Sequence, residues 1–307
     1  MNYKMFCQEM NKAVNAMLEK DMTSKLHTSL KNNGKEKVGL IIEEVGIKIS
    51  PVIYLEEYYD NYLKGKSISQ LADEIREFYY SLRREGVGDY KSVFDYDRIK
   101  EKILFKLINT KKNSKFLKGV PHKRFLDMSI VFYVLLSRSD EQEAIMTVTN
   151  SHIKQWEVST DSLWERVLEN IQIIAVPSFC TMESVLAGMM AKCNPKIASQ
   201  KSVNLLEHDT GVRDTMFILS NSSGSYGAAS IAYPQIADEI GEMLKSDYYI
   251  LPSSIHELVV LPYSDKYEIA ELNRMIRNIN KKCVPDDEVL GEQCYRYLLR
   301  EKRIVKC

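Results

Sequence analysis

The chain lacks three features that assign many proteins to a function: an excess of one charge, a long apolar run and a standard catalytic signature. Its 307 residues include 42 basic and 42 acidic side chains, so the formal net charge is zero. Whole-chain electrostatics therefore predict no polyanionic partner. The longest strongly apolar run covers only residues 130–136. A membrane-spanning helix needs about 20 such residues, so we expect no membrane partner.

Cysteine is scarce and scattered. None of the six forms a C-x-x-C pair, and none stands at metal-ligand spacing from a histidine: Cys7, Cys180, Cys193, Cys283, Cys294 and Cys307. Scattered cysteines in a long chain are typical of free thiols in a reducing compartment. In the first 18 residues, apolar side chains recur at helical spacing and charged residues lie between them. A signal peptide needs an unbroken apolar stretch instead. The sequence therefore predicts a cytoplasmic protein.

What the chain does contain is a layout that occurs three times: two short apolar runs, a turn between them, and an amphipathic helix. The paired strands are expected at residues 25–30 and 38–42, 129–136 and 144–149, and 215–219 and 228–232. A further pair is expected at 248–251 and 258–261. This pattern predicts an α+β fold of antiparallel β-hairpins covered by amphipathic helices, in repeated ββα-like units.

Several helices are expected at particular positions. Pro51 is placed as the first residue of a helix that carries tyrosines on its apolar side, and a second helix covers residues 68–82. Further helices are expected over residues 96–108, 162–171, 179–190, 234–244 and 266–280. The methionines of the 179–190 segment, Met182, Met189 and Met190, are interpreted as core-filling side chains.

The charge distribution suggests how the chain is organised. The segment 98–124 holds ten basic residues and one acidic residue, Glu101. We therefore divide the chain into an N-terminal α+β region at 1–92, a basic helical connector at 93–124 and a C-terminal α+β region at 125–307.

Four local sequences occur together along the chain: KNNG at 31–34, SPVIYL at 50–55, RFLD at 124–127 and LPSSIHE at 251–257. With them the chain resembles a family of clostridial gut-bacterial proteins that is catalogued only as a domain of unknown function. It is more distantly similar to the YtpQ-like proteins of Firmicutes. The resemblance spans roughly residues 3–297. It implies a bacterial cytoplasmic protein and supplies no activity or catalytic residue.

The sharpest polar cluster is Ser254, His256 and Glu257, to which Asp127 is added as a further candidate. Serine, histidine and a carboxylate are the ingredients of nucleophilic hydrolysis. The alternative is a turn whose polar side chains satisfy backbone groups, because a triad normally converges from separate segments. His122, Asp127 and His256 would make a metal or acid–base site only if the fold brought them together, and no spacing supports that. The loop at 224–227 lacks the ending of a phosphate-binding loop, and its glycines are interpreted as hairpin residues.

The basic segment supplies a different hypothesis. Nucleic acid would be contacted by Lys106, Lys111, Lys112, Lys115 and Lys118. The simpler interpretation is a solvated helix face and a lysine-rich linker.

The absence of a standard catalytic motif favours a non-enzymatic binding or regulatory protein over a hydrolase or a nucleic-acid binder. The expected partner is another protein or a second copy of the chain, and no cofactor or metal is expected. Tyr54, Tyr58, Tyr59 and Tyr62 would suit a protein interface if they were exposed.

Overall fold

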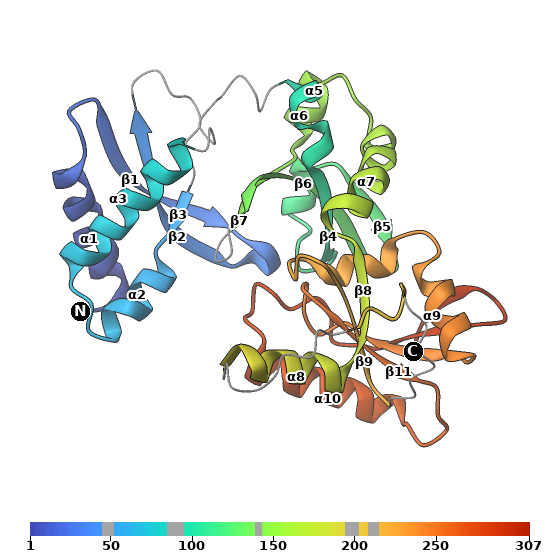
Figure 1. Ribbon diagram of the computed structural model, residues 1–307. Coiled ribbons are helices and arrows are strands. Elements are labelled where there is room, and N and C mark those ends of the chain that lie inside the picture. The colour runs from blue at the N-terminus through green and yellow to red at the C-terminus, as the bar shows by residue number, and fades with distance from the viewer. Residues whose placement is uncertain (45–51, 85–94, 139–142, 194–202, 208–214) are drawn as a thin grey trace. The chain divides into compact units, whose positions relative to one another are not determined.

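The computed structural model describes residues 1–44, 52–84, 95–138, 143–193, 203–207 and 215–307 (Figure 1). Helices and antiparallel sheets occur together, which confirms the α+β class. The chain divides into two compact units. Unit 1 comprises Met1–Lys102 and Val134–Met146, and unit 2 comprises Ile103–Tyr133 and Thr147–Cys307.

Unit 1 contains a three-stranded antiparallel sheet in the order β1-β2-β3. Its elements are α1 (Tyr3–Met17), β1 (Met22–Leu30), β2 (Glu36–Glu44), β3 (Val52–Tyr54), α2 (Glu56–Leu63), α3 (Ile68–Arg84) and α5 (Tyr96–Ile99). The hairpin of β1 and β2 is confirmed, with Leu26 opposite Leu40. The Asn-Gly turn works as predicted, because Asn33 and Gly34 both adopt positive φ, at 59° and 71°.

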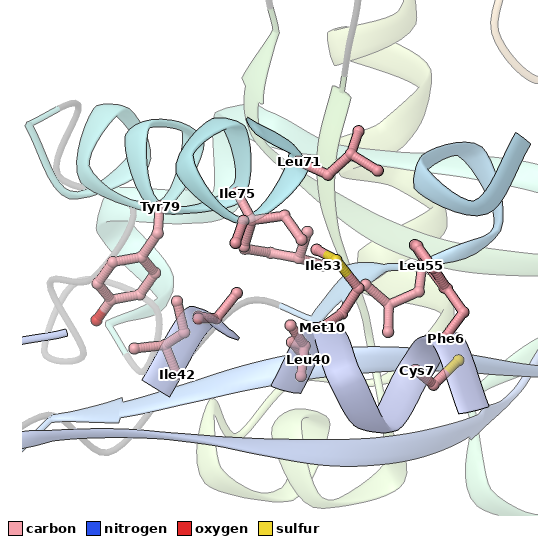
Figure 2. Close-up of a cluster of buried hydrophobic side chains, with 12 residues drawn as sticks. Phe6, Cys7, Met10, Leu40, Ile42, Ile53, Leu55, Leu71, Ile75 and Tyr79 are labelled. Carbon is pink, nitrogen blue, oxygen red and sulfur yellow. The ribbon is translucent and has the colours of Figure 1, made fainter. Parts of the chain in front are cut away.

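The core of unit 1 lies between the sheet and helices α1 and α3. Figure 2 shows Leu71, Ile75 and Tyr79 along one side of α3, above Leu40 and Ile42 of β2. The spacing of four residues places these α3 side chains on one face, as the sequence pattern predicts. Tyr58, Tyr59 and Tyr62 pack against this core and are partly buried. These tyrosines are therefore not exposed, as they would have to be to form a protein interface.

The helix expected from Pro51 is wrong in its first turn. Residues 52–54 form strand β3, and α2 begins at Glu56. Val52 and Ile53 are β-branched and fit a half-buried strand, where β3 completes the sheet beside β2. Pro51 itself lies outside the described residues.

Unit 2 is built around a six-stranded antiparallel sheet in the order β13-β12-β10-β11-β9-β8. The strands are β8 (Pro177–Thr181), β9 (Phe217–Asn221), β10 (Tyr248–Leu251), β11 (Leu258–Pro262), β12 (Tyr295–Leu298) and β13 (Arg303–Lys306). Its helices are α6 (Asn150–Gln155), α7 (Thr160–Ile174), α8 (Met182–Cys193), α9 (Ile236–Leu244) and α10 (Ile269–Cys283).

Helices α9 and α10 cover opposite faces of this sheet. Leu272 and Ile276 of α10 pack with Tyr249, Leu251 and Leu261. The hydroxyl of Tyr248, the neighbour of Tyr249, donates instead to the Ala237 carbonyl of α9. Adjacent residues of a strand point to opposite faces, so β10 is buried on both sides.

The smaller sheet has the order β4-β6-β5, and β7 pairs with β6. Its strands are β4 (Ile103–Asn109), β5 (His122–Phe125), β6 (Met128–Arg138) and β7 (Glu143–Thr147). The division between the two units falls within β6 and β7. The prediction of a helix over residues 96–108 is right only at its start, because α5 ends at Ile99, a 3-10 helix covers Lys100–Lys102, and β4 begins at Ile103. The side chains of β4 are nearly all buried, as in a strand that is covered on both faces. Its sequence therefore lacks the alternation of apolar and polar residues that indicates a half-exposed strand.

Two further predictions need correction. Residues 228–232 form part of a 3-10 helix, η4 (Gly227–Ala232), and not a strand. The hairpin expected from residues 215–219 and 228–232 therefore does not form, and β9 pairs with β8 and β11 instead. The helix expected over 179–190 begins at Met182, because residues 177–181 are the edge strand β8.

Candidate functional site

The fold brings five aromatic and charged side chains of unit 2 together, and we call them the His256 cluster: Lys106, Tyr133, Tyr226, His256 and Glu288. Lys106 and Tyr133 lie on β4 and β6, Tyr226 lies before η4, His256 lies between β10 and β11, and Glu288 follows α10. The cluster therefore depends on the tertiary fold and not on any one local sequence.

The contacts within the His256 cluster fix the orientation of the imidazole ring. The backbone N–H of Tyr226 donates to His256 Nδ1 at 3.2 Å, and the two rings stack with centroids 5.5 Å apart. Because Nδ1 is the acceptor, a neutral His256 carries its proton on Nε2. That atom lies 3.7 Å from Glu288 Oε1.

A cation and a second tyrosine contact the Tyr226 ring. Lys106 Nζ lies 4.6 Å from the centroid of the Tyr226 ring, which is cation–π distance. The rings of Tyr226 and Tyr133 are 5.2 Å apart. Lys106, one of the five lysines predicted to contact nucleic acid, thus packs against aromatic rings.

The loop before Tyr226 is held by its own polar groups. Asn221 Oδ1 accepts from the Ser223 N–H at 3.1 Å, and Ser223 Oγ accepts from the Ser225 N–H at 3.1 Å. Ser220 Oγ donates to the His256 carbonyl at 2.9 Å. These N–H groups are directed into the loop, so the geometry does not provide the outward-facing N–H groups that bind a phosphate.

Ser254 and Glu257 are not arranged around His256 as a triad. Ser254 Oγ accepts from the backbone N–H of His256 at 3.0 Å, which is a local turn interaction. Both ring nitrogens of His256 have other neighbours, Tyr226 and Glu288. Glu257 has no hydrogen-bond or ion-pair partner among the described residues. The hydrolase hypothesis thus stays a prediction that this geometry does not favour.

Asp127 lies in the turn between β5 and β6 and contacts the last two strands. Its carboxylate accepts from the Tyr295 hydroxyl and from Lys306 Nζ, the latter at 2.7 Å. Partial burial opposes the charged form, but these two hydrogen bonds outweigh it and lower the pKa of Asp127. Burial and the bond to Asp127 raise the pKa of Tyr295. Asp127 thereby links the β5–β6 turn to strands β12 and β13.

His122 has a local partner, because its Nδ1 lies 3.0 Å from the Val120 carbonyl. Within the described residues, no three side chains of His, Cys, Asp or Glu form a group able to hold a metal ion. His122, Asp127 and His256 each have separate contacts.

The remaining basic residues lie between β4 and β5. Lys112 pairs with Glu292 at 2.9 Å. Lys111, Lys115 and Lys118 are exposed and have no ion-pair partner in the part of the chain that the structure describes. They carry positive charge on one short segment, and nucleic-acid binding by it stays a prediction.

Helix α8 exposes two of the three methionines that were expected to fill the core. Met189 and Met190 are exposed by 54% and 60%, and Leu186 by 51%. They occupy positions i, i+3 and i+4, which share one side of a helix. We call these three residues the α8 apolar face. A signal was present in the sequence, because α8 is apolar on nearly all sides and has no polar face to turn to solvent.

The structure defines a two-unit α+β protein with an exposed apolar helix face. In the described part of the chain, no helix is both long and apolar enough to cross a bilayer. The chain belongs to the family of unknown function DUF5688, whose model matches residues 3–298. Comparison with the curated proteins and with the solved structures found no match.

Proposed function

We propose that the protein is a non-enzymatic binding protein that self-associates through the α8 apolar face. The observation that carries this proposal is the exposure of Leu186, Met189 and Met190, each more than half accessible. Large apolar side chains gathered on one side of a surface helix mark interaction sites. Methionine suits such a surface because its flexible side chain adapts to the partner.

A second copy of the chain is the occupant that the molecule favours. A twofold interface places the same patch on both partners, so an apolar stripe meets an identical stripe. The formal net charge of zero means that two copies do not repel one another over long distances. Twelve residues of α8 span about 18 Å, enough for two helices to pack over their exposed turns.

The contact area limits the expected affinity. Three half-exposed side chains on each copy bury less than the roughly 1,200 Å² that is typical of stable complexes. We therefore expect weak association, with a dissociation constant on the order of tens to hundreds of micromolar.

Sedimentation equilibrium over a wide range of concentrations tests the proposal. The wild-type chain is expected to shift from monomer to dimer, and Leu186→Glu is expected to weaken association by at least about tenfold, because it places a charge in the apolar contact. Ile173→Glu is the matched control, since Ile173 is an apolar residue of α7 that is 84% exposed. A wild-type chain that stays monomeric, or an equal effect of both variants, contradicts the proposal.

The proposed setting is the bacterial cytoplasm. Five cysteines among the described residues are free thiols, which supports a reducing compartment. The clostridial relationship and the YtpQ likeness stay predictions from the sequence.

A further inference from the structure

Two cysteines of unit 2 face each other across the last pair of strands. Strands β12 and β13 are antiparallel, with Tyr295 opposite Lys306. The same register places Cys294 opposite Cys307, and the Cys307 N–H donates to the Cys294 carbonyl at 3.2 Å. Directly opposed residues of antiparallel strands have Cα atoms about 4.5–5.5 Å apart, whichever of the two pair types they form. A disulfide requires about 4.4–6.8 Å, so the backbone already suits one.

The two thiols differ in their surroundings. Cys294 is fully buried in the core between α10 and the sheet, and its N–H is fixed by Asn273 Oδ1 at 2.8 Å. Cys307 is exposed. One thiol is therefore accessible to a reagent in solution, and the other is held rigidly behind it.

The electrostatics favour a thiolate at the accessible position. A hydrogen bond from the Cys294 thiol lowers the pKa of Cys307 against the opposing effect of burial, and the positive charge of Arg296 lowers it further. The hydrogen bond to Cys307, together with burial, raises the pKa of Cys294. Cysteines beside a cationic residue are the reactive ones, and buried cysteines are usually inert.

We infer that Cys294 and Cys307 form a redox-modification site that peroxides convert reversibly into a cross-strand disulfide. The Cys307 thiolate attacks one peroxide oxygen, which breaks the O–O bond and leaves a sulfenic acid on Cys307 and one water after protonation. The Cys294 sulfur then attacks the Cys307 sulfur, the S–O bond of the sulfenic acid breaks, and the departing hydroxyl takes the Cys294 thiol proton and leaves as a second water. One hydrogen peroxide is thus reduced to two waters while two thiols are oxidised to one disulfide, and a dithiol reductant reverses the step.

The consequence for the fold follows from the position of β13. Within the described ranges of the chain, β13 is an edge strand whose one pairing partner is β12. A covalent link at Cys307 joins this edge to a residue that is anchored in the core. Oxidation is therefore expected to slow amide exchange in β13 by at least about tenfold.

Peptide mapping by mass spectrometry after hydrogen peroxide treatment of the reduced, full-length protein tests the inference. We expect a linked peptide pair, lighter by two hydrogen atoms, that contains Cys294 and Cys307 and disappears on reduction. Cys307→Ser removes the link and leaves the fold intact, because Cys307 is exposed. Cys283→Ser is the matched control, since Cys283 is an exposed cysteine of α10 with no opposed partner among the described cysteines, and this variant keeps the link.

Three results would overturn the inference. These are oxygen adducts on Cys307 without a link, a link from Cys307 to any cysteine other than Cys294 of the same chain, and equal reaction rates at Cys307 and Cys283. The mapping of the wild-type chain decides the first two without any variant.

Discussion

At the scale of single residues, the candidate site was only partly predictable from sequence. His256 stands out as a polar residue in a turn, but its carboxylate neighbour is Glu288, which is 32 positions away. The two meet because the segment after α10 returns to this turn, where the Ile255 N–H donates to the Glu288 carbonyl at 2.8 Å. No local pattern encodes such a long-range contact, whereas Ser254 and Glu257 attract notice only through adjacency.

A substitution of Gly227, the neighbour of Tyr226, tests how tightly the His256 cluster is packed. A Cβ at this position would contact Ser220 Oγ and lie 2.6 Å from the His256 carbonyl oxygen and 2.7 Å from the Asn221 nitrogen. Two of these three atoms belong to the backbone and cannot move without distorting the turn. We expect Gly227→Ala to lower the free energy of unfolding by at least about 2 kcal/mol, as measured by urea denaturation. Gly119→Ala is the control, because a Cβ there has no neighbour within 4 Å; a similar loss in both variants would contradict the steric explanation.

At the scale of elements, periodicity predicted those elements that have one buried face. The β1–β2 hairpin, α3 and α10 each combine an apolar side with a polar side, so their patterns were informative. Strand β4 is buried on both faces, and its apolar positions also fit a helix. Helix η4 consists largely of small residues that pack tightly in unit 2, and burial of this kind leaves no period to detect.

The contact of the β5–β6 turn with β12 and β13 predicts a pH-dependent stability. Because the pKa of Asp127 is lowered in the folded state, its stabilising effect is present above its unfolded pKa of about 3.9 and is lost as pH falls through the folded value. Asp127→Asn keeps an acceptor for Tyr295 and removes the charge. We expect it to cost about 1 kcal/mol at pH 7, because the ion pair is partly exposed, and progressively less as the pH falls through the folded pKa of Asp127.

Chemical denaturation at several pH values measures this difference. Asp161→Asn serves as the control, since Asp161 pairs with Lys123 at the same 2.7 Å but is 82% exposed. That variant is expected to match the wild type at every pH. A constant difference between Asp127→Asn and the wild type from pH 2 to pH 7 would show that the charge of Asp127 is not the cause.

At the scale of the whole molecule, each unit has a hydrophobic core of its own. The core of unit 1 joins α1, α3 and the β1–β2–β3 sheet. In unit 2, one cluster lies between α10 and the six-stranded sheet, and another lies beside β4 and β6. The sequence suggested a composition change near residue 98, but it did not reveal that residues 134–146 return to unit 1. The amino-acid composition does not change at the points where the chain returns to unit 1 and leaves it again.

Separate cores predict that the two units lose structure independently. Leu40 of β2 and Leu219 of β9 are both fully buried, one in each unit. Truncating either to alanine removes about 2–5 kcal/mol of packing and transfer free energy from its own core. In native-state hydrogen exchange, Leu40→Ala is expected to accelerate exchange in β1 and β2 and to leave β10 and β11 unchanged, whereas Leu219→Ala does the reverse. Each variant is thus the control for the other, and acceleration throughout the chain in either one would show a single cooperative unit.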